Sequence, residues 1–526
     1  MKHFAVSATN RKYLFTIIAV AAVLRICMAA FFHPPLISDD RDYDAIARSL
    51  VHGQGFSLDG APTAYRLPGY PLLLAGSYGV FGDVKTPIRF FQAAADVLSC
   101  LLLFSIGKKM FSESVGLIAA AALAVFPIQV LYVSHLMTET LFTTVLLLIV
   151  WVVVIEEDDL GLAAASVILG ALTGAGLLLR TTVALIPAVI FLYRYRRGIP
   201  FTKNAGGLML IVATAAIVVA PWLVRNYDMF HRLSMTSNAG VNFWMGNHSG
   251  ASGAYSFPRD NNPLAAVADD FDRSDLGFQR GLDFIRSHPL EYCLIEGKKF
   301  AHFFAADYWL LMTMEYKPEW ATSPNAAAVF SQLSLSNIIL LHLPYVVAVL
   351  LGSFGLICPA RGSENRFFLL RGILLYWLVI HLVFYADARY RFPVVPLFIL
   401  AAAYAWFIIR QKAYQLSKPR LVGLTLLCLL YFGGWTGEIV TLVSKTSSHI
   451  PVAGQNYLNS DESAVRRAFV QNSLPKTAIV YLTNRFSFCI LYPLNQTKDT
   501  TYENQQINPQ RTCTQQSQER RGTATS

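Results

Sequence analysis

The sequence predicts an all-α polytopic membrane protein with about eleven transmembrane helices. Hydrophobic residues make up 54% of its 526 residues and charged residues only 14%, whereas soluble proteins carry about 25% charged residues. The mean hydropathy is +0.43. The apolar residues gather into runs, several of them close to the roughly 20 residues that a helix needs to cross a bilayer. A large soluble core is therefore excluded as the main architecture.

Eleven apolar runs follow one another along the chain, and each is predicted to be a membrane span. They cover residues 14–32, 88–107, 115–133, 141–155, 162–179, 181–193, 205–224, 337–358, 367–385, 392–409 and 421–443. Two of the runs are short, so the count is open by one or two. A further apolar run, 72–81, is too short to span and is expected in the interface or as a re-entrant segment.

Basic residues set the expected orientation. Lys and Arg gather in the loops that lie inside if the N-terminus is cytoplasmic, as the positive-inside rule requires. The acidic loop 156–159 gives no support, but acids count little in this rule. We expect a cytoplasmic N-terminus and an outer C-terminus. The net charge of +10 then reflects membrane orientation, and no nucleic-acid partner is inferred.

The polar segments divide the chain into three parts. Residues 1–443 form the transmembrane domain, with long outer loops at 33–87 and 225–336; the second loop contains a charged stretch, 271–304, that is expected to be helical. Residues 444–497 are expected to form a small outer α/β segment with a strand at 477–482. Residues 498–526 are rich in Gln, Thr, Asn and Arg and are expected to be disordered.

Acidic residues at outer span ends are the first candidates for chemistry. Asp39 and Asp40 follow the first span, at the water-exposed lip of the membrane, and precede a short amphipathic segment, 45–50. A carboxylate there can act as a general base on an acceptor hydroxyl. Glu139 begins the fourth span. The alternative interpretations are a solvated loop for the two aspartates and a helix start capped by Thr138 for Glu139.

Four arginines lie near outer helix ends in this orientation, and they are candidate ligands for a phosphate: Arg66, Arg225, Arg389 and Arg391. Arginine binds phosphate through bidentate, charge-assisted hydrogen bonds. The alternative is interfacial anchoring. Positive charge on the outer side opposes the orientation bias, however, and calls for an acidic partner, which is either an anionic ligand or a local acid such as Asp387.

Several short motifs together resemble the GT-C membrane glycosyltransferases. The motifs are Asp39-Asp40-x-x-Tyr43, the segment 62–71, Thr138-Glu139, the segment 221–227, Gly246-Asn247 and the segment 388–393. Within this group the chain resembles the bacterial relatives of the protein O-mannosyltransferases, including the lipid A aminoarabinose transferase and the Rgt-type galacturonosyltransferases. The resemblance covers roughly residues 10 to 440.

The resemblance implies a GT-C helical bundle that uses a polyprenyl-phosphate sugar on the periplasmic face of the bacterial inner membrane. The family's catalytic acid matches Asp39; the family often has Glu next, where this chain has Asp40, so the division of roles between the two acids stays open. Further residues expected in the substrate pocket are Tyr43, Tyr70, His135 and Asn247. The tail departs from the compact C-terminal domain of many relatives.

The predicted function is transfer of a sugar from a polyprenyl-phosphate donor to a lipid A, glycan or protein acceptor. The sequence contains no Walker A, GxGxxG or HExxH motif, so the activated donor is expected from the membrane. A divalent cation beside the acids is left open, because no ligand set can be identified. The alternative function is a transporter or flippase of lipid-linked sugar, which would place charges at mid-membrane, ideally in repeated halves.

Overall fold

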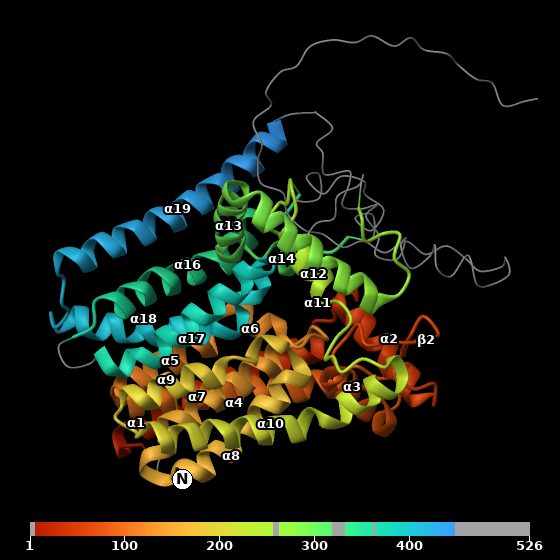
Figure 1. Cartoon of the computed structure of the whole chain (residues 1–526). Helices are drawn as coiled ribbons and strands as arrows, with labels where there is room; N and C mark the ends of the chain where they lie inside the picture. Colours follow the sequence, from red (N-terminus) through yellow and green to blue (C-terminus); the bar gives the residue numbers. More distant parts are fainter. Residues whose placement is uncertain (1–5, 256–261, 318–331, 361–363, 448–526) are drawn as a thin grey trace, which may run out of the picture. The chain divides into compact units, whose positions relative to one another are not determined.

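The structure is a computed structural model that describes residues 6–255, 262–317, 332–360 and 364–447 (Figure 1). The chain divides into two units, Met1–Ile490 and Leu491–Ser526. All the elements below belong to the first unit. The expected strand at 477–482 and the expected tail at 498–526 lie outside the described residues.

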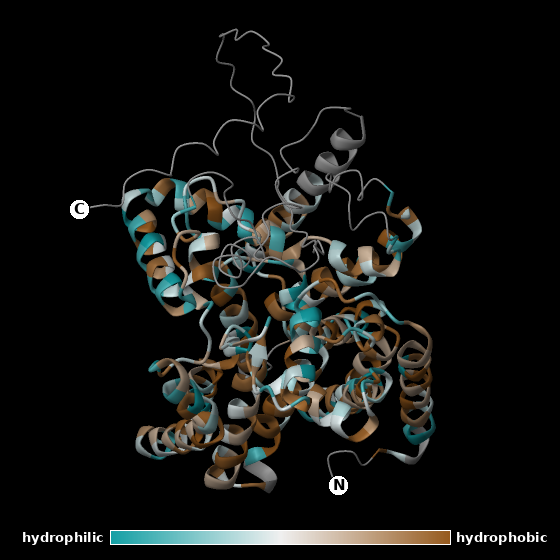
Figure 2. Cartoon of the chain, turned by 90° about the vertical axis from the view of Figure 1, so that its right-hand side faces the viewer, coloured by the Kyte–Doolittle hydropathy of each residue, from teal (hydrophilic) through white to brown (hydrophobic). Residues whose placement is uncertain are grey.

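Eight helical segments in the described part of the chain are long and apolar enough to cross a membrane. They are α1 (Ala8–Phe31), α4 (Thr86–Met110), α7 (Glu139–Asp159), α8 (Leu162–Leu179), α10 (Phe201–Phe230), α16 (Leu335–Ile357), α17 (Glu364–Val383), and the 3-10 helix η4 (Ala388–Val394) continued by α18 (Val395–Arg410). Helices suit a lipid environment because they satisfy every backbone hydrogen bond within the segment. Hydrophobic residues predominate over the helical bundle (Figure 2). The all-α polytopic fold is confirmed.

The three remaining predicted spans are also helical but fall outside this group of eight. Run 115–133 is divided into α5 (Glu113–Ala124) and α6 (Pro127–Tyr132), and run 181–193 into η2 (Thr181–Val183) and α9 (Ile186–Arg196). Run 421–443 lies in α19 (Lys418–Ser447), whose side chains are described only to residue 436.

A buried arginine satisfies the backbone at the break between α5 and α6. Arg25 of α1 donates from Nη1 to the carbonyl of Ala124 at 2.7 Å and from Nη2 to that of Leu123 at 3.1 Å. Its Nε lies 2.6 Å from Asp96 Oδ2. Carbonyls at a helix end have no partner within the helix, so a charged side chain inside the bundle here serves the fold.

The predicted outer loops form the segments that carry the candidate site. The first contains α2 (Asp39–Val51), a short antiparallel hairpin of β1 (Ser57–Leu58) and β2 (Ala61–Pro62), and α3 (Gly69–Phe81). The second contains α11 (Ala239–Gly246), α12 (Asp270–Ser287), α13 (Pro289–Phe304) and α14 (Tyr308–Met314). The helical prediction for 271–304 is confirmed, with a break at His288 before Pro289. The two loops meet where Ser237 N donates to Ala64 O at 3.0 Å.

Candidate active site

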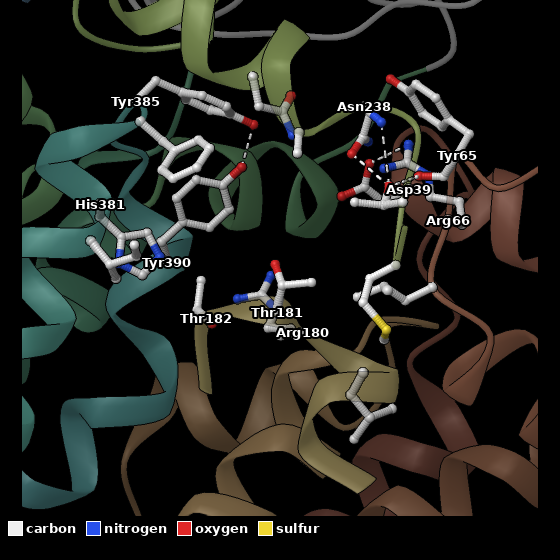
Figure 3. Close-up of a pocket in the computed structure, with 18 of the residues that line it drawn as sticks. Asp39, Tyr65, Arg66, Arg180, Thr181, Thr182, Asn238, His381, Tyr385 and Tyr390 are labelled. Carbon is white, nitrogen blue, oxygen red and sulfur yellow. Dashed lines mark hydrogen bonds and ion pairs between the residues drawn. The ribbon is translucent and has the colours of Figure 1, made fainter. Parts of the chain in front are cut away.

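Five segments that are far apart in the sequence, together with Tyr255, surround a cavity of about 460 Å³ (Figure 3). The segments are the start of α2, residues 65–67, the junction 179–182 between α8 and η2, residues 234–242 at the start of α11, and residues 380–390 from α17 into η4. Asp39 and Arg66 lie on one side of the view, Tyr385 and Tyr390 on the other, and Arg180 between them. The cavity is therefore built from the predicted loops and the ends of the spans.

Asp39 lies between two arginines at the edge of this cavity. As the first residue of α2, its carboxylate is favoured by the helix dipole. Oδ1 lies 2.7 Å from Arg66 Nη2, and Oδ2 lies 2.8 Å from Arg389 Nη2. Only 7% of Asp39 is exposed, so the expected water-exposed position is wrong. The side chain is buried because two cations from other segments close over it.

Arg66 joins Asp39 to a second acid of α2. Its Nε and Nη2 donate to Asp42 Oδ2 at 2.9 and 2.7 Å. The guanidinium also lies over the Tyr65 ring, 4.8 Å from the ring centroid. Arg66 is therefore shared between two carboxylates, and it fixes residues 65–67 against the first turn of α2.

Arg389 enters the cavity from η4. Asp387 caps this short helix by accepting from Arg389 N at 2.9 Å, which orients the backbone. The guanidinium bonds Asp39 through Nη2, while its buried Nε has no hydrogen-bond partner. An arginine can donate to a phosphate from two nitrogens on one edge of its planar group, so an unpaired N–H beside the cavity is suited to an anionic ligand.

Arg180 is a cavity residue that the sequence analysis missed. Its Nη2 lies 2.8 Å from Glu139 Oε1, its Nε donates to Thr138 Oγ1 at 3.0 Å, and its guanidinium lies over the Tyr390 ring. A signal was present, because Arg180 lies between two adjacent apolar runs on the predicted outer side. A positively charged residue on the outer side calls for an anionic partner. This reasoning, which pointed to Arg389, applies equally to Arg180.

Glu139 is placed behind this arginine and outside the cavity lining. Thr138 makes no side-chain capping hydrogen bond. The alternative interpretation, a helix start capped by Thr138, therefore does not explain the Thr138-Glu139 motif. Glu139 is fully buried, and Arg180 provides its cation. The acid can thus influence the cavity through the arginine.

Aromatic, hydroxyl and amide groups complete the lining. They come from Tyr43, Tyr65, Thr181, Thr182, Asn238, Asn242, His381, Tyr385 and Tyr390. The hydroxyls of Tyr385 and Tyr390 are hydrogen-bonded to each other. The sequence analysis expected only Tyr43 of these in the substrate pocket, although Tyr65 and Tyr390 lie in the motif segments 62–71 and 388–393. No spacing pattern links them, because they converge only through tertiary packing.

Three residues expected in the substrate pocket lie outside the lining, in the packed interior. Tyr70 donates to Gln92 Oε1 at 2.6 Å, and His135 Nε2 lies 2.8 Å from Thr313 Oγ1. Asn247 donates to Val383 O at 2.9 Å and accepts from Lys299 Nζ at 3.0 Å. Each of these polar groups is hydrogen-bonded within the protein, so the three side chains support the segments around the cavity.

Asp40 also lies outside the lining, beside Asp39 in sequence. Its Oδ1 accepts from Ser38 N at 2.7 Å and from Arg41 N at 2.9 Å, and its Oδ2 is buried without a hydrogen-bond partner. Burial raises the pKa of Asp40 to about 7, and the nearby Asp39 carboxylate adds to this effect. Asp40 holds the start of α2 in place.

Two of the four predicted phosphate ligands bond elsewhere. Arg225 donates to Thr63 O at 2.8 Å and to Phe56 O at 3.0 Å, joining α10 to the first loop. Arg391 donates to Phe303 O at 2.8 Å and lies over the Tyr345 ring. The structure therefore brings Asp39, Arg66 and Arg389 to one cavity. Glu139 lies outside the lining and contacts the lining residue Arg180. Arg225 and Arg391 do not line the cavity.

The acids of the site do not fit a preformed metal centre. Within the described residues, no group of three or more His, Cys, Asp or Glu side chains is placed to hold a metal ion. Both oxygens of Asp39 face guanidinium groups, and a cation beside them would meet like charge. We derive no chemical step through a metal.

Residues 63–224 match the family model described as dolichyl-phosphate-mannose-protein mannosyltransferase. This segment begins next to Arg66 and includes Glu139 and Arg180. The expected resemblance to GT-C glycosyltransferases is confirmed over these residues. No curated protein sequence matches the chain.

Among solved structures, the chain is similar to the oligosaccharyltransferase AglB of Archaeoglobus fulgidus in complex with an inhibitory peptide and a dolichol-phosphate. The identity is 12%, the TM-score 0.44, and the match covers 92% of this chain and 62% of that one. It is also similar to ArnT of Cupriavidus metallidurans bound to undecaprenyl phosphate, with 15% identity, a TM-score of 0.38, and coverage of 76% and 78%. The chain thus spans less than two thirds of the AglB chain.

Proposed function

Residues 63–224 match the dolichyl-phosphate-mannose-protein mannosyltransferase family, and from this we propose that the protein transfers a sugar from a polyprenyl-phosphate donor. The acceptor is a lipid A, glycan or protein group at the membrane surface. The observation that carries the proposal is the position of Asp39, whose two oxygens pair with Arg66 and Arg389 at one cavity. A transferase of this kind needs an acid–base group and cations for a leaving phosphate within reach of one substrate.

The proposed reaction is displacement at the anomeric carbon. The acceptor oxygen forms a bond to that carbon, the bond between carbon and phosphate oxygen breaks, and the electron pair leaves on the lipid phosphate. Asp39 takes the proton from an acceptor hydroxyl, or orients an acceptor that is already ionised. A single displacement inverts the configuration at the anomeric carbon.

Arg389 and Arg66 stabilise the departing phosphate in this proposal. Donors already in place where negative charge develops stabilise a transition state more than a ground state. Arg180 adds a third cation, held by Glu139. The tyrosine, threonine and asparagine side chains of the lining supply hydrogen-bond donors and acceptors for a polyhydroxylated substrate.

We also propose that the site faces the periplasm from a bacterial inner membrane, with the N-terminus cytoplasmic. The support is the distribution of basic residues between alternate loops. A reporter fused after Ser444 is expected on the periplasmic side. A cytoplasmic reporter at this position would reverse the proposed orientation.

The transferase proposal is tested by incubating the purified protein with a radiolabelled bacterial lipid extract. Label should move from the lipid-phosphate fraction to a new product, whose acid hydrolysis identifies the sugar. Asp39→Asn serves as the paired inactive variant. Absence of any transfer by folded wild-type protein from extracts that contain lipid-linked sugars would contradict the proposal.

The transport alternative requires charges along a mid-membrane path. Arg25 and Asp96 are charges inside the bundle, but both are fully buried, and neither lines the cavity described above. Arg25 is bonded to Asp96 and to the carbonyls at the end of α5. This pair stabilises a helix break, and it gives the transport alternative no support.

A further inference from the structure

Both carboxylate oxygens of Asp39 are paired with cations. Oδ1 pairs with Arg66 and Oδ2 with Arg389 at 2.7 and 2.8 Å. A general base must present an oxygen to the proton it removes. The arrangement therefore holds Asp39 in a form that is poorly suited to take a proton.

The cations of the cavity are already matched by carboxylates. Arg66 pairs with Asp39 and Asp42, Arg389 pairs with Asp39, and Arg180 pairs with Glu139. A phosphate that enters this cavity must compete with one of these acids for its cation. Binding is therefore an exchange of anionic partners.

Arg389 is the cation at which this exchange is easiest. Its contact with Asp39 uses Nη2, while Nε stays buried without a hydrogen-bond partner. A phosphate can accept from both nitrogens on that edge of the guanidinium, which would satisfy the unpaired N–H. Arg66, in contrast, already donates from Nε and Nη2 to Asp42. Arg389 would therefore gain a hydrogen bond by exchanging Asp39 for a phosphate, whereas Arg66 would continue to hold Asp39 in place.

We propose that Asp39 and the lipid phosphate of the donor compete for Arg389, so that donor binding releases Asp39 for catalysis. This inference rests on the proposed function. The Asp39–Arg389 pair seen in the structure is the closed state of this latch, in which Asp39 holds the cation that the phosphate would bind. When the phosphate takes Arg389, Asp39 keeps its contact with Arg66, and Oδ2 becomes available to an acceptor hydroxyl. The donor then binds before the acceptor can be activated.

Competition between Asp39 and the phosphate for Arg389 has a testable consequence for variants of Asp39. Removing its charge should tighten phosphate binding while it abolishes transfer. A ligand that binds only the open form has its affinity reduced by the fraction of protein in that form. We expect Asp39→Asn to bind farnesyl phosphate about tenfold more tightly than the wild type, which corresponds to an open fraction of about a tenth.

The experiment measures binding of farnesyl phosphate, farnesol and inorganic phosphate to the full chain in detergent, with melting recorded for every variant. Asp44→Asn is the matched control, because Asp44 is an acid of the same helix. It pairs with Arg48 and Lys85 and lies outside the cavity lining. Its affinity for farnesyl phosphate should equal that of the wild type. Asp39→Ala is a second variant should Asp39→Asn be unstable.

The outcomes separate the latch from the proposed function. Tighter binding of farnesyl phosphate by Asp39→Asn, with Asp44→Asn unchanged, supports the latch. If Asp39→Asn also binds inorganic phosphate more tightly than the wild type, the phosphate group is the competitor. If only farnesyl phosphate binds more tightly, the lipid chain is also required. Equal or weaker binding by folded Asp39→Asn and Asp39→Ala, with wild-type binding intact, overturns the latch alone. No binding of farnesyl phosphate by any folded variant overturns both proposals.

Discussion

Arg180 Nη2 lies 2.8 Å from Glu139 Oε1, and this pair joins the end of α8 to the start of α7 beside the cavity. Glu139 is buried, whereas Arg180 reaches the lining and lies over the Tyr390 ring. The acid therefore acts on the cavity through the position and charge of the arginine. Two residues that the sequence places 41 positions apart form one unit.

The first prediction concerns this unit. Arg180→Gln leaves the buried Glu139 carboxylate without its cation, and breaking a buried pair from one side typically costs about 3–5 kcal/mol. We expect a clear fall in melting temperature. The double variant Glu139→Gln with Arg180→Gln should melt above Arg180→Gln, because neither charge is then left unpaired. Thermal unfolding of Arg180→Gln, of Glu139→Gln, of the double variant and of the wild type measures this coupling.

Transfer rates test whether Glu139 has a separate role. If it works only through Arg180, the two single variants and the double variant should lose similar activity, because residues that act as a unit are not additive. A double variant whose loss equals the product of the two single losses would give Glu139 its own contact with substrate.

The second prediction concerns the two adjacent acids of α2. Asp39→Asn removes the proposed base, and loss of general-base catalysis typically lowers the rate by about 10²–10⁴-fold. Asp40→Asn should lose less, because Asp40 lies outside the cavity lining and holds backbone N–H groups. Transfer rates from folded protein decide the order. A larger loss in Asp40→Asn would move the base role to Asp40.

Hydropathy predicted the helical spans because a bilayer requires long apolar helices with internally satisfied backbones. It did not predict the break between α5 and α6. Pro127 marks the start of α6, but the carbonyls before it are satisfied by Arg25 from α1. A charge inside an apolar run signalled an unusual position, and only the packed bundle shows its partner.

The arginines show the same limit at the site. Arg389 and Arg391 are two residues apart and were expected to share a ligand. In a 3-10 helix with three residues per turn, side chains two residues apart are rotated by about 240° around the axis and so point about 120° apart. Arg389 faces Asp39, and Arg391 faces Phe303 and Tyr345. Arg225 is likewise turned toward backbone carbonyls more than 160 residues away in sequence. Charge and span position select candidates, but tertiary geometry decides which of them face the cavity.

The third prediction compares this matched pair of arginines. Arg389→Gln should weaken binding of farnesyl phosphate, because it removes a cation from the cavity. Arg391→Gln should leave that affinity nearly unchanged and instead lower the melting temperature, since a buried carbonyl loses its donor at a typical cost of about 1–3 kcal/mol. Both quantities are measured on both variants. Equal loss of affinity in the two variants would return Arg391 to the phosphate site.

The last prediction concerns Asp40 and pH. Burial raises its pKa from 3.8 to about 7, so the folded chain binds a proton that the unfolded chain releases between these values. Stability from this group is full below about pH 4 and is lost as the pH rises through about 7. Asp40→Asn cannot ionise, yet its amide oxygen can still accept from Ser38 N and Arg41 N.

The melting temperature of the wild type should therefore fall relative to that of Asp40→Asn when the pH is raised from about 5 to about 8. Other titrating groups contribute equally to both proteins, so the difference between the two melting curves isolates Asp40. A difference that stays constant over this range would mean that Asp40 is ionised throughout, and its buried Oδ2 would then need a cationic partner near α2.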